Sequence, residues 1–134
     1  MWKAITMAGI LFALTTSTLR AAESSDGLWA KTKEECLDKE SPDSKTFIDL
    51  SKAIGGKPAP IVDHYEDHCR VDGKTVVGDV VNVSVTCFEF WDDFKKDFEG
   101  RKTTIKLSPG KNGTLKIDGK SYLRCKTNGG PTDR

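Results

Sequence analysis

Apolar and polar residues alternate most regularly over residues 80–90, where valines and a cysteine on one parity are separated by Asn, Ser and Thr on the other. A period of two with β-branched residues is typical of a strand that buries one face. Residues 61–71 alternate in the same way. We therefore predict that these two segments form neighbouring antiparallel strands, folded around Gly78.

Four further segments have strand composition: residues 46–50, 103–107, 115–117 and 122–125. Asp118-Gly119 favours a two-residue hairpin turn before the last segment, whereas a looser turn would align Leu115 with Leu123, and the sequence leaves both registers open. The pattern predicts a mainly β fold: a small antiparallel barrel or sandwich of about six strands, with one or two short helices and two disulfides. The predicted core residues are Trp29, Val81, Val83, Val85, Ile105, Leu107, Leu115 and Ile117.

Two short helices are predicted beside the sheet. Thr32 followed by Glu35 is a capping-box pattern, which opens a helical turn that runs to about Asp38. The second helix is predicted over residues 92–99, because aspartates precede lysines there and Gly100 supplies a stop signal.

The N-terminus has the layout of a secretory signal peptide, with Lys3 before an apolar run over residues 4–14 and then small residues. This run is shorter than the roughly 20 apolar residues of a membrane-spanning helix. We expect a periplasmic or secreted protein with no membrane insertion after cleavage. The expected divisions are a signal peptide over 1–22, a single β domain over 23–125 and a flexible C-terminal tail over 126–134.

The charge of the mature chain is close to zero. Loss of Lys3 and Arg20 reduces the 21 basic residues to 19, against 20 acidic ones. Both signs are interleaved along the chain, whereas nucleic-acid-binding domains concentrate basic residues on one face. We therefore expect no nucleic-acid partner, and we expect a monomer. Asn82 and Asn112 begin glycosylation sequons, which matter only in a host that glycosylates asparagine.

All four cysteines lie in the predicted mature domain, and an even number in an exported chain predicts two disulfides. The antiparallel register around Gly78 places Cys69 opposite Cys87, so this is the preferred bridge. It leaves Cys36 to pair with Cys125. Four cysteines allow three pairings, and the sequence does not exclude the other two.

Aromatic residues crowd the segment that follows Cys87. One interpretation is that the predicted helix covers them as a second small core, which we favour because soluble monomers seldom leave large apolar patches open. The other is that part of the cluster stays exposed and binds a partner. The candidate partner-binding residues are Phe88, Phe90, Trp91, Phe94 and Phe98.

Catalytic and metal-binding patterns are weak. On one continuous strand, His64 and His68 would lie roughly 13 Å apart, too far to share an ion. The interpretation that we favour is a solvated polar face beside a disulfide. Paired carboxylates such as Asp92-Asp93 lie among lysines, which is typical of surface charge. We predict no enzyme, no metal and no cofactor.

The chain resembles small uncharacterised exported proteins of rhizobium-type alphaproteobacteria. The likeness rests on Gly27-Leu28-Trp29-Ala30 before Cys36, Tyr65-Glu66 before Cys69-Arg70-Val71, an alternating strand that ends in Cys87, Trp91, and Tyr122-Leu123-Arg124-Cys125. It implies a periplasmic location and the same four-cysteine framework, and it brings no activity. The Gly-x-Trp opening also resembles that of lipocalin-like bacterial protease inhibitors, which have a small β-barrel. That resemblance implies inhibition by an N-terminal segment, here residues 23–28.

Three functions follow from these observations. The leading hypothesis is a non-enzymatic exported binding domain that recognises a protein or envelope component through residues 88–98. The second is an inhibitor of a secreted hydrolase, either a protease or a lysozyme. The third is a small metal-dependent enzyme, which would require His64 and His68 to converge with a carboxylate.

Overall fold

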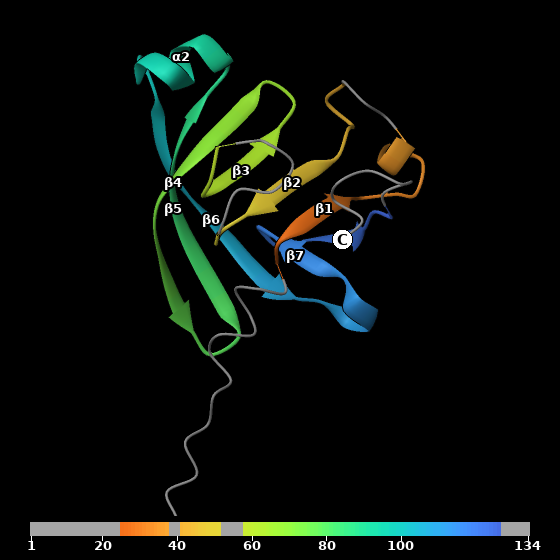
Figure 1. Cartoon of the computed structure of the whole chain (residues 1–134). Helices are drawn as coiled ribbons and strands as arrows, with labels where there is room; N and C mark the ends of the chain where they lie inside the picture. The colour runs from red at the N-terminus through yellow and green to blue at the C-terminus, as the bar shows by residue number, and fades with distance from the viewer. Residues whose placement is uncertain (1–24, 38–40, 52–57, 127–134) are drawn as a thin grey trace, which may run out of the picture.

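Eight antiparallel strands form a closed barrel, in which each strand pairs with its neighbours in sequence and β8 returns to pair with β1 (Figure 1). The computed structural model describes residues 25–37, 41–51 and 58–126. The predicted signal peptide, and the predicted tail after residue 126, lie outside the described residues. The strands are β1 (Gly27–Ala30), β2 (Thr46–Asp49), β3 (Ile61–His64), β4 (Asp67–Val77), β5 (Val80–Phe88), β6 (Arg101–Pro109), β7 (Leu115–Ile117) and β8 (Lys120–Arg124).

The predicted mainly β fold is confirmed as a barrel, but with eight strands rather than about six. Gly27–Ala30 forms a strand that the sequence pattern did not predict. The prediction of one strand over residues 61–71 was wrong, because the chain turns at Tyr65-Glu66 and divides into β3 and β4. Glu66 takes a φ of 51° in this turn, with neither Gly nor Asn as a local signal. Pairing of the strands on both sides holds the turn in place.

The β4–β5 hairpin has the predicted register beside the cysteines. Val71 pairs with Val85, and Cys69 pairs with Cys87. The turn itself is Gly78-Asp79 and not Gly78 alone, and Gly78 supplies the positive φ that such a turn requires. An irregularity between Val71 and Gly73 shifts the register by one residue, and this restores the predicted pairing nearer the cysteines.

The barrel interior is apolar at its centre, where side chains of one parity from every strand meet. All of the predicted core residues are buried there except Ile105, which is partly buried and packs against the others. The structure adds Ile48, Leu50 and Val62 to this core. The two-residue turn at Asp118-Gly119 sets Leu115 opposite Tyr122, so the looser of the two registers is wrong.

The barrel closes where the first strand meets the last. The guanidinium carbon of Arg124 lies 4.2 Å from the centre of the Trp29 ring, and its Nη1 donates to the carbonyl of Asp26 at 2.8 Å. Gly27 has a φ of 137°, and a Cβ there would lie 2.5 Å from the Arg124 Nη1. Glycine is therefore required for Arg124 to cover the tryptophan.

Both preferred disulfides are present: Cys69–Cys87 joins β4 to β5, and Cys36–Cys125 joins the segment after β1 to the residue that follows β8. They indicate an oxidising, extracellular-type environment.

The predicted helical turn at Thr32 forms as the short 3-10 helix η1 (Glu35–Leu37), and the Thr32 hydroxyl accepts the Glu35 N–H at 3.2 Å. A second 3-10 helix, η2 (Lys111–Gly113), precedes β7. Within the described ranges, no helix is long and apolar enough to span a membrane.

Loss of the Cys36–Cys125 bridge should destabilise the protein more than loss of the Cys69–Cys87 bridge. The bridges span 89 and 18 residues, so loop closure alone gives upper values of about 4.6 and about 3 kcal/mol. Urea unfolding of C36S/C125S and C69S/C87S variants measures the difference. Equal losses, or a larger loss for the short bridge, would contradict the loop-closure explanation.

Candidate functional site

The helix that follows β5 lies against the outside of the barrel, at the end opposite the tip of the β4–β5 hairpin (Figure 1). This helix, α2 (Trp91–Lys96), is shorter than predicted. It ends because Asp97 takes the left-handed conformation, and the Phe98 N–H then bonds to the Asp93 carbonyl at 3.0 Å. Gly100 is therefore not the residue that stops the helix.

The aromatic cluster divides into a packed part and an exposed part. Phe88 is only 2% exposed, and it meets Phe94 edge to face at 5.5 Å between ring centres. Trp91 meets Phe94 in the same manner at 5.2 Å. Phe90 and Phe98 are each 56% exposed. Part of the cluster is therefore covered and part is exposed, whereas binding by the exposed part stays a prediction.

Gly100 has a packing role on this face. A Cβ at this position would lie 2.4 Å from the Thr86 Cγ2 and 2.8 Å from the Phe88 ring. The chain that leaves α2 therefore passes directly over Phe88, which explains why Phe88 is so well buried although it points out of the barrel.

An ion-pair network fastens the end of α2 to the sheet. Arg70 on β4 donates to Asp97 at 2.9 Å and to Asp72 at 3.0 Å, and both hydrogen bonds raise the pKa of its guanidinium. The pKa of Asp72 is lowered, first by a hydrogen bond from the Thr86 hydroxyl at 2.5 Å and then by Arg70. Asp72 is therefore held in its charged form.

Trp91 is oriented by a histidine–carboxylate pair. His68 Nδ1 donates to Asp63 Oδ1 at 2.5 Å, and the His68 ring stacks on Trp91 at 4.0 Å with 18° between the planes. In the part of the chain that the structure describes, no hydroxyl or thiol is hydrogen-bonded to the other nitrogen of His68. The pair fixes the plane on which Trp91 rests.

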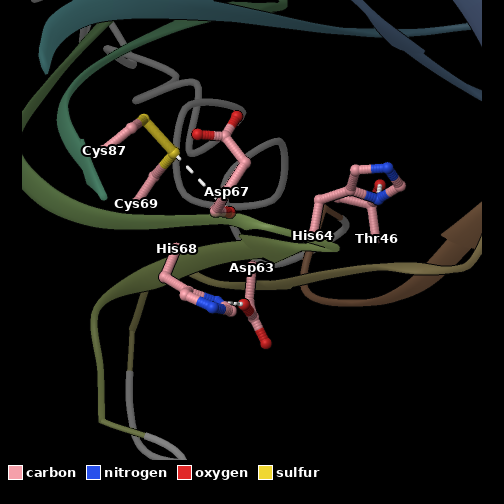
Figure 2. Close-up of polar contacts among 7 residues, drawn as sticks. All are labelled: Thr46, Asp63, His64, Asp67, His68, Cys69 and Cys87. Carbon is pink, nitrogen blue, oxygen red and sulfur yellow. Dashed lines mark hydrogen bonds and ion pairs between the residues drawn. A yellow bond between two sulfur atoms is a disulfide. The ribbon is translucent and has the colours of Figure 1, made fainter. Parts of the chain in front are cut away.

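The two histidines lie on opposite faces of the sheet. Figure 2 shows His68 and Asp63 on one side of the ribbon, and the Cys69–Cys87 disulfide on the other. His64 on β3 pairs with Asp67 on β4, so their side chains lie on the same face of the sheet. Asp67 faces the barrel interior together with Cys69. The prediction that both histidines lie on the same face of one strand was wrong, because the turn between β3 and β4 reverses the chain.

Metal ligation has little support in the described ranges. His64 Nε2 donates to the Pro42 carbonyl at 3.0 Å and its Nδ1 lies 3.1 Å from the Thr46 hydroxyl, so both ring nitrogens are occupied. One cluster there has metal-ligand spacing, and two of its three members are the sulfurs of Cys69 and Cys87. These sulfurs are joined in a disulfide and offer no thiolate.

A groove of about 460 Å³ runs along the outside of the barrel between α2 and the strands β1, β2 and β3. We call it the outer groove. Its aromatic and apolar lining comes from Leu28, Phe47, Tyr65, Phe90 and Trp91. Phe47 is buried, whereas Tyr65 and Phe90 are exposed. Phe88, Phe94 and Phe98 do not line this groove, so two of the five candidate partner-binding residues meet there.

The charge of the outer groove is negative. Glu66 and Glu89 line it and are exposed, and Asp63 lies beside them with His68 as its partner. Lys45 is the one lysine or arginine in the lining. Aromatic faces next to carboxylates attract cations, because the ring quadrupole and the carboxylate charge act in the same direction.

The N-terminal segment that was expected to act as an inhibitory arm is built into the barrel where it is described. Gly27 and Leu28 belong to β1, and the Asp26 carboxylate accepts the Leu50 N–H at 2.8 Å and the Ser51 hydroxyl at 2.7 Å. Residues 23 and 24 lie outside the described residues. From Asp26 onward the segment is thus held to β2 and to the residues that follow it.

Sequence reasoning missed Phe47 and Tyr65, and one signal could have found Phe47. Residues 46–50 carry apolar side chains on both parities, as residues 87–90 do, and this indicates a strand with both faces covered. Tyr65 had no such signal, because it lies in the turn that the pattern did not predict.

Comparison of the chain with protein-family models, with curated proteins and with solved structures finds no match.

Replacement of Gly100 by alanine should destabilise the protein by about 1–3 kcal/mol, because the added methyl must displace Phe88 or the backbone. Gly73→Ala is the matched control, since nothing lies within 4 Å of a Cβ at that position. Urea unfolding of both variants measures the effect. Equal stability of the two variants would show that Phe88 is not packed under residue 100.

The Thr86–Asp72 hydrogen bond should contribute stability at neutral pH and lose it in acid. A lowered pKa means that the folded state holds the charged form more tightly than the unfolded state. The contribution is therefore present above the unfolded pKa of an aspartate and disappears as the pH falls through the folded one. We expect Thr86→Val to cost a small amount of stability at pH 7 and progressively less as the pH falls below the unfolded pKa of an aspartate, measured by urea unfolding across that range. A cost that grows in acid would contradict this.

Proposed function

We propose that this protein is a non-enzymatic exported binding domain that holds an extended, positively charged segment of a partner protein in the outer groove. The observation that carries the proposal is the lining itself: Tyr65, Phe90 and Trp91 lie beside Glu66 and Glu89 in one groove. Exposed aromatic residues with adjacent carboxylates suit an arginine or lysine side chain of the partner.

Preorganisation of Trp91 supports this proposal. The ring is stacked on His68, and His68 is fixed in turn by Asp63, so little side-chain freedom remains to be lost on binding. The ion pair of Arg70 with Asp97 holds the helix that carries Trp91. The groove therefore needs no large rearrangement to receive a segment.

Phe90 and Phe98 provide a matched pair for the test, because they are equally exposed and only Phe90 lines the outer groove. The probes are a capped, unstructured peptide of alternating arginine and leucine residues, and the same peptide with citrulline in place of arginine. Isothermal titration of the oxidised protein should show binding of the arginine peptide that weakens with salt, and binding of the citrulline peptide at least tenfold weaker.

Phe90→Ala should weaken binding of the arginine peptide by about tenfold, whereas Phe98→Ala should leave it within twofold. Equal affinity for the arginine and citrulline peptides would contradict the proposed chemistry of the segment. Equal losses in the two phenylalanine variants would place the contact on α2 rather than in the outer groove, and no binding of either peptide would contradict the proposal as a whole.

A further inference from the structure

A second cavity lies inside the barrel, on the opposite face of the sheet from the outer groove. It has a volume of about 280 Å³, and every strand, or the residue that follows it, contributes to its lining. It opens at the end of the barrel where β3 turns into β4, and we call it the mouth cavity. Its lining side chains include Thr46, Val62, Ile105, Ile117 and Tyr122.

The buried wall of the mouth cavity is mostly apolar, and its two buried polar residues are Ser44 and Thr46. Val62, Ile117 and the Cys69–Cys87 disulfide are buried and line it, together with the partly buried Ile105. No charged residue belongs to this buried wall. A charge placed there would lose its hydration without a partner, so the part of a ligand that enters must be uncharged.

The charges of the mouth cavity lie at its rim, and most are already bonded. Arg101 and Asp67 form an ion pair at 3.2 Å, with both side chains largely exposed. Glu35 accepts the Lys31 N–H at 2.9 Å, and Asp118 accepts the Lys106 N–H at 2.8 Å. Four of the six charged residues of the lining are acidic and two are basic, so the rim is negative and disfavours an anionic ligand.

Polar groups of the wall differ in what they can still bind. His64 is saturated by Thr46 and the Pro42 carbonyl. Tyr122 is half-buried, and its hydroxyl makes no hydrogen bond within the described part of the chain. Tyrosine hydroxyls in such positions usually find a partner, so this one is available to a ligand.

We propose that the mouth cavity is a separate binding site for a small uncharged molecule, with an apolar body of one or two rings and one hydrogen-bonding group. The apolar body lies against Val62, Ile105 and Ile117, and the polar group bonds to the Tyr122 hydroxyl. The volume of about 280 Å³ is slightly below the roughly 300 Å³ at which the usual range for small-molecule sites begins, which limits the ligand to this size. Ser44 and His64 line both cavities, and the other lining residues of the two sites differ.

The probe is 1-naphthol, titrated into the ¹⁵N-labelled oxidised protein and followed by amide chemical shifts. We expect saturable shifts at Val62, Ile105, Ile117 and Tyr122. The control ligand is 1-naphthalenesulfonate, which has the same rings and a permanent negative charge, and we expect it to bind at least tenfold more weakly.

Three variants locate the site. Tyr122→Phe keeps the ring and removes the hydroxyl, so affinity for 1-naphthol should fall about three- to tenfold. Thr103→Trp should block the mouth and abolish the shifts, and Phe90→Ala should change nothing because it alters only the outer groove.

The site is disproved if the shifts are absent or confined to the Phe90–Trp91 region, if the sulfonate binds equally well, or if Tyr122→Phe retains full affinity. Tyr122→Phe keeps the test valid should Thr103→Trp fail to fold. Since the arginine peptide binds elsewhere, failure of this site and failure of the outer groove give different results.

Discussion

Closure of the barrel between β1 and β8 is the contact on which both proposed sites depend. Few residues make it: Trp29 pairs with Arg124, Ala30 pairs with Leu123, and the Cys125 N–H bonds to the Leu28 carbonyl at 2.8 Å. The Arg124 guanidinium over Trp29 and the Cys36–Cys125 disulfide reinforce this short seam. If the seam opened, β1 would no longer hold Leu28 at the outer groove, and the mouth cavity would lose one wall.

The period of two along each strand separates the chemistry of the two faces. Asp63 and His68 point outward and support Trp91, while Asp67 lines the mouth cavity and His64 lines both cavities. One layer of backbone therefore divides an aromatic groove with carboxylates among its rings from a pocket whose buried wall carries no charge. This separation explains why each proposed site is expected to take a different ligand: a cationic peptide segment outside and an uncharged small molecule inside.

Much of the barrel could be predicted from local patterns, and the failures have physical causes. Alternation in residues 80–90 predicted β5, and the position of its partner predicted the Cys69–Cys87 bridge. The turn at Tyr65-Glu66 could not be predicted, because neither residue favours the positive φ that tertiary pairing imposes on Glu66. That one error concealed the outer groove, since the turn brings Asp63 beside His68. The division of the aromatic cluster also needed the structure, because it depends on how closely Gly100 passes Phe88.

The most direct test of the outer groove is to follow the indole N–H resonances of Trp91 and Trp29 in one NMR titration with the arginine–leucine peptide. Trp91 lines the groove, whereas Trp29 is buried in the barrel and donates its indole N–H to the Ser25 carbonyl at 2.8 Å, so it serves as an internal reference. We expect the Trp91 resonance to move in a saturable manner while that of Trp29 stays in place. A stationary Trp91 resonance at saturating peptide, or equal movement of both resonances, would contradict recognition by the outer groove.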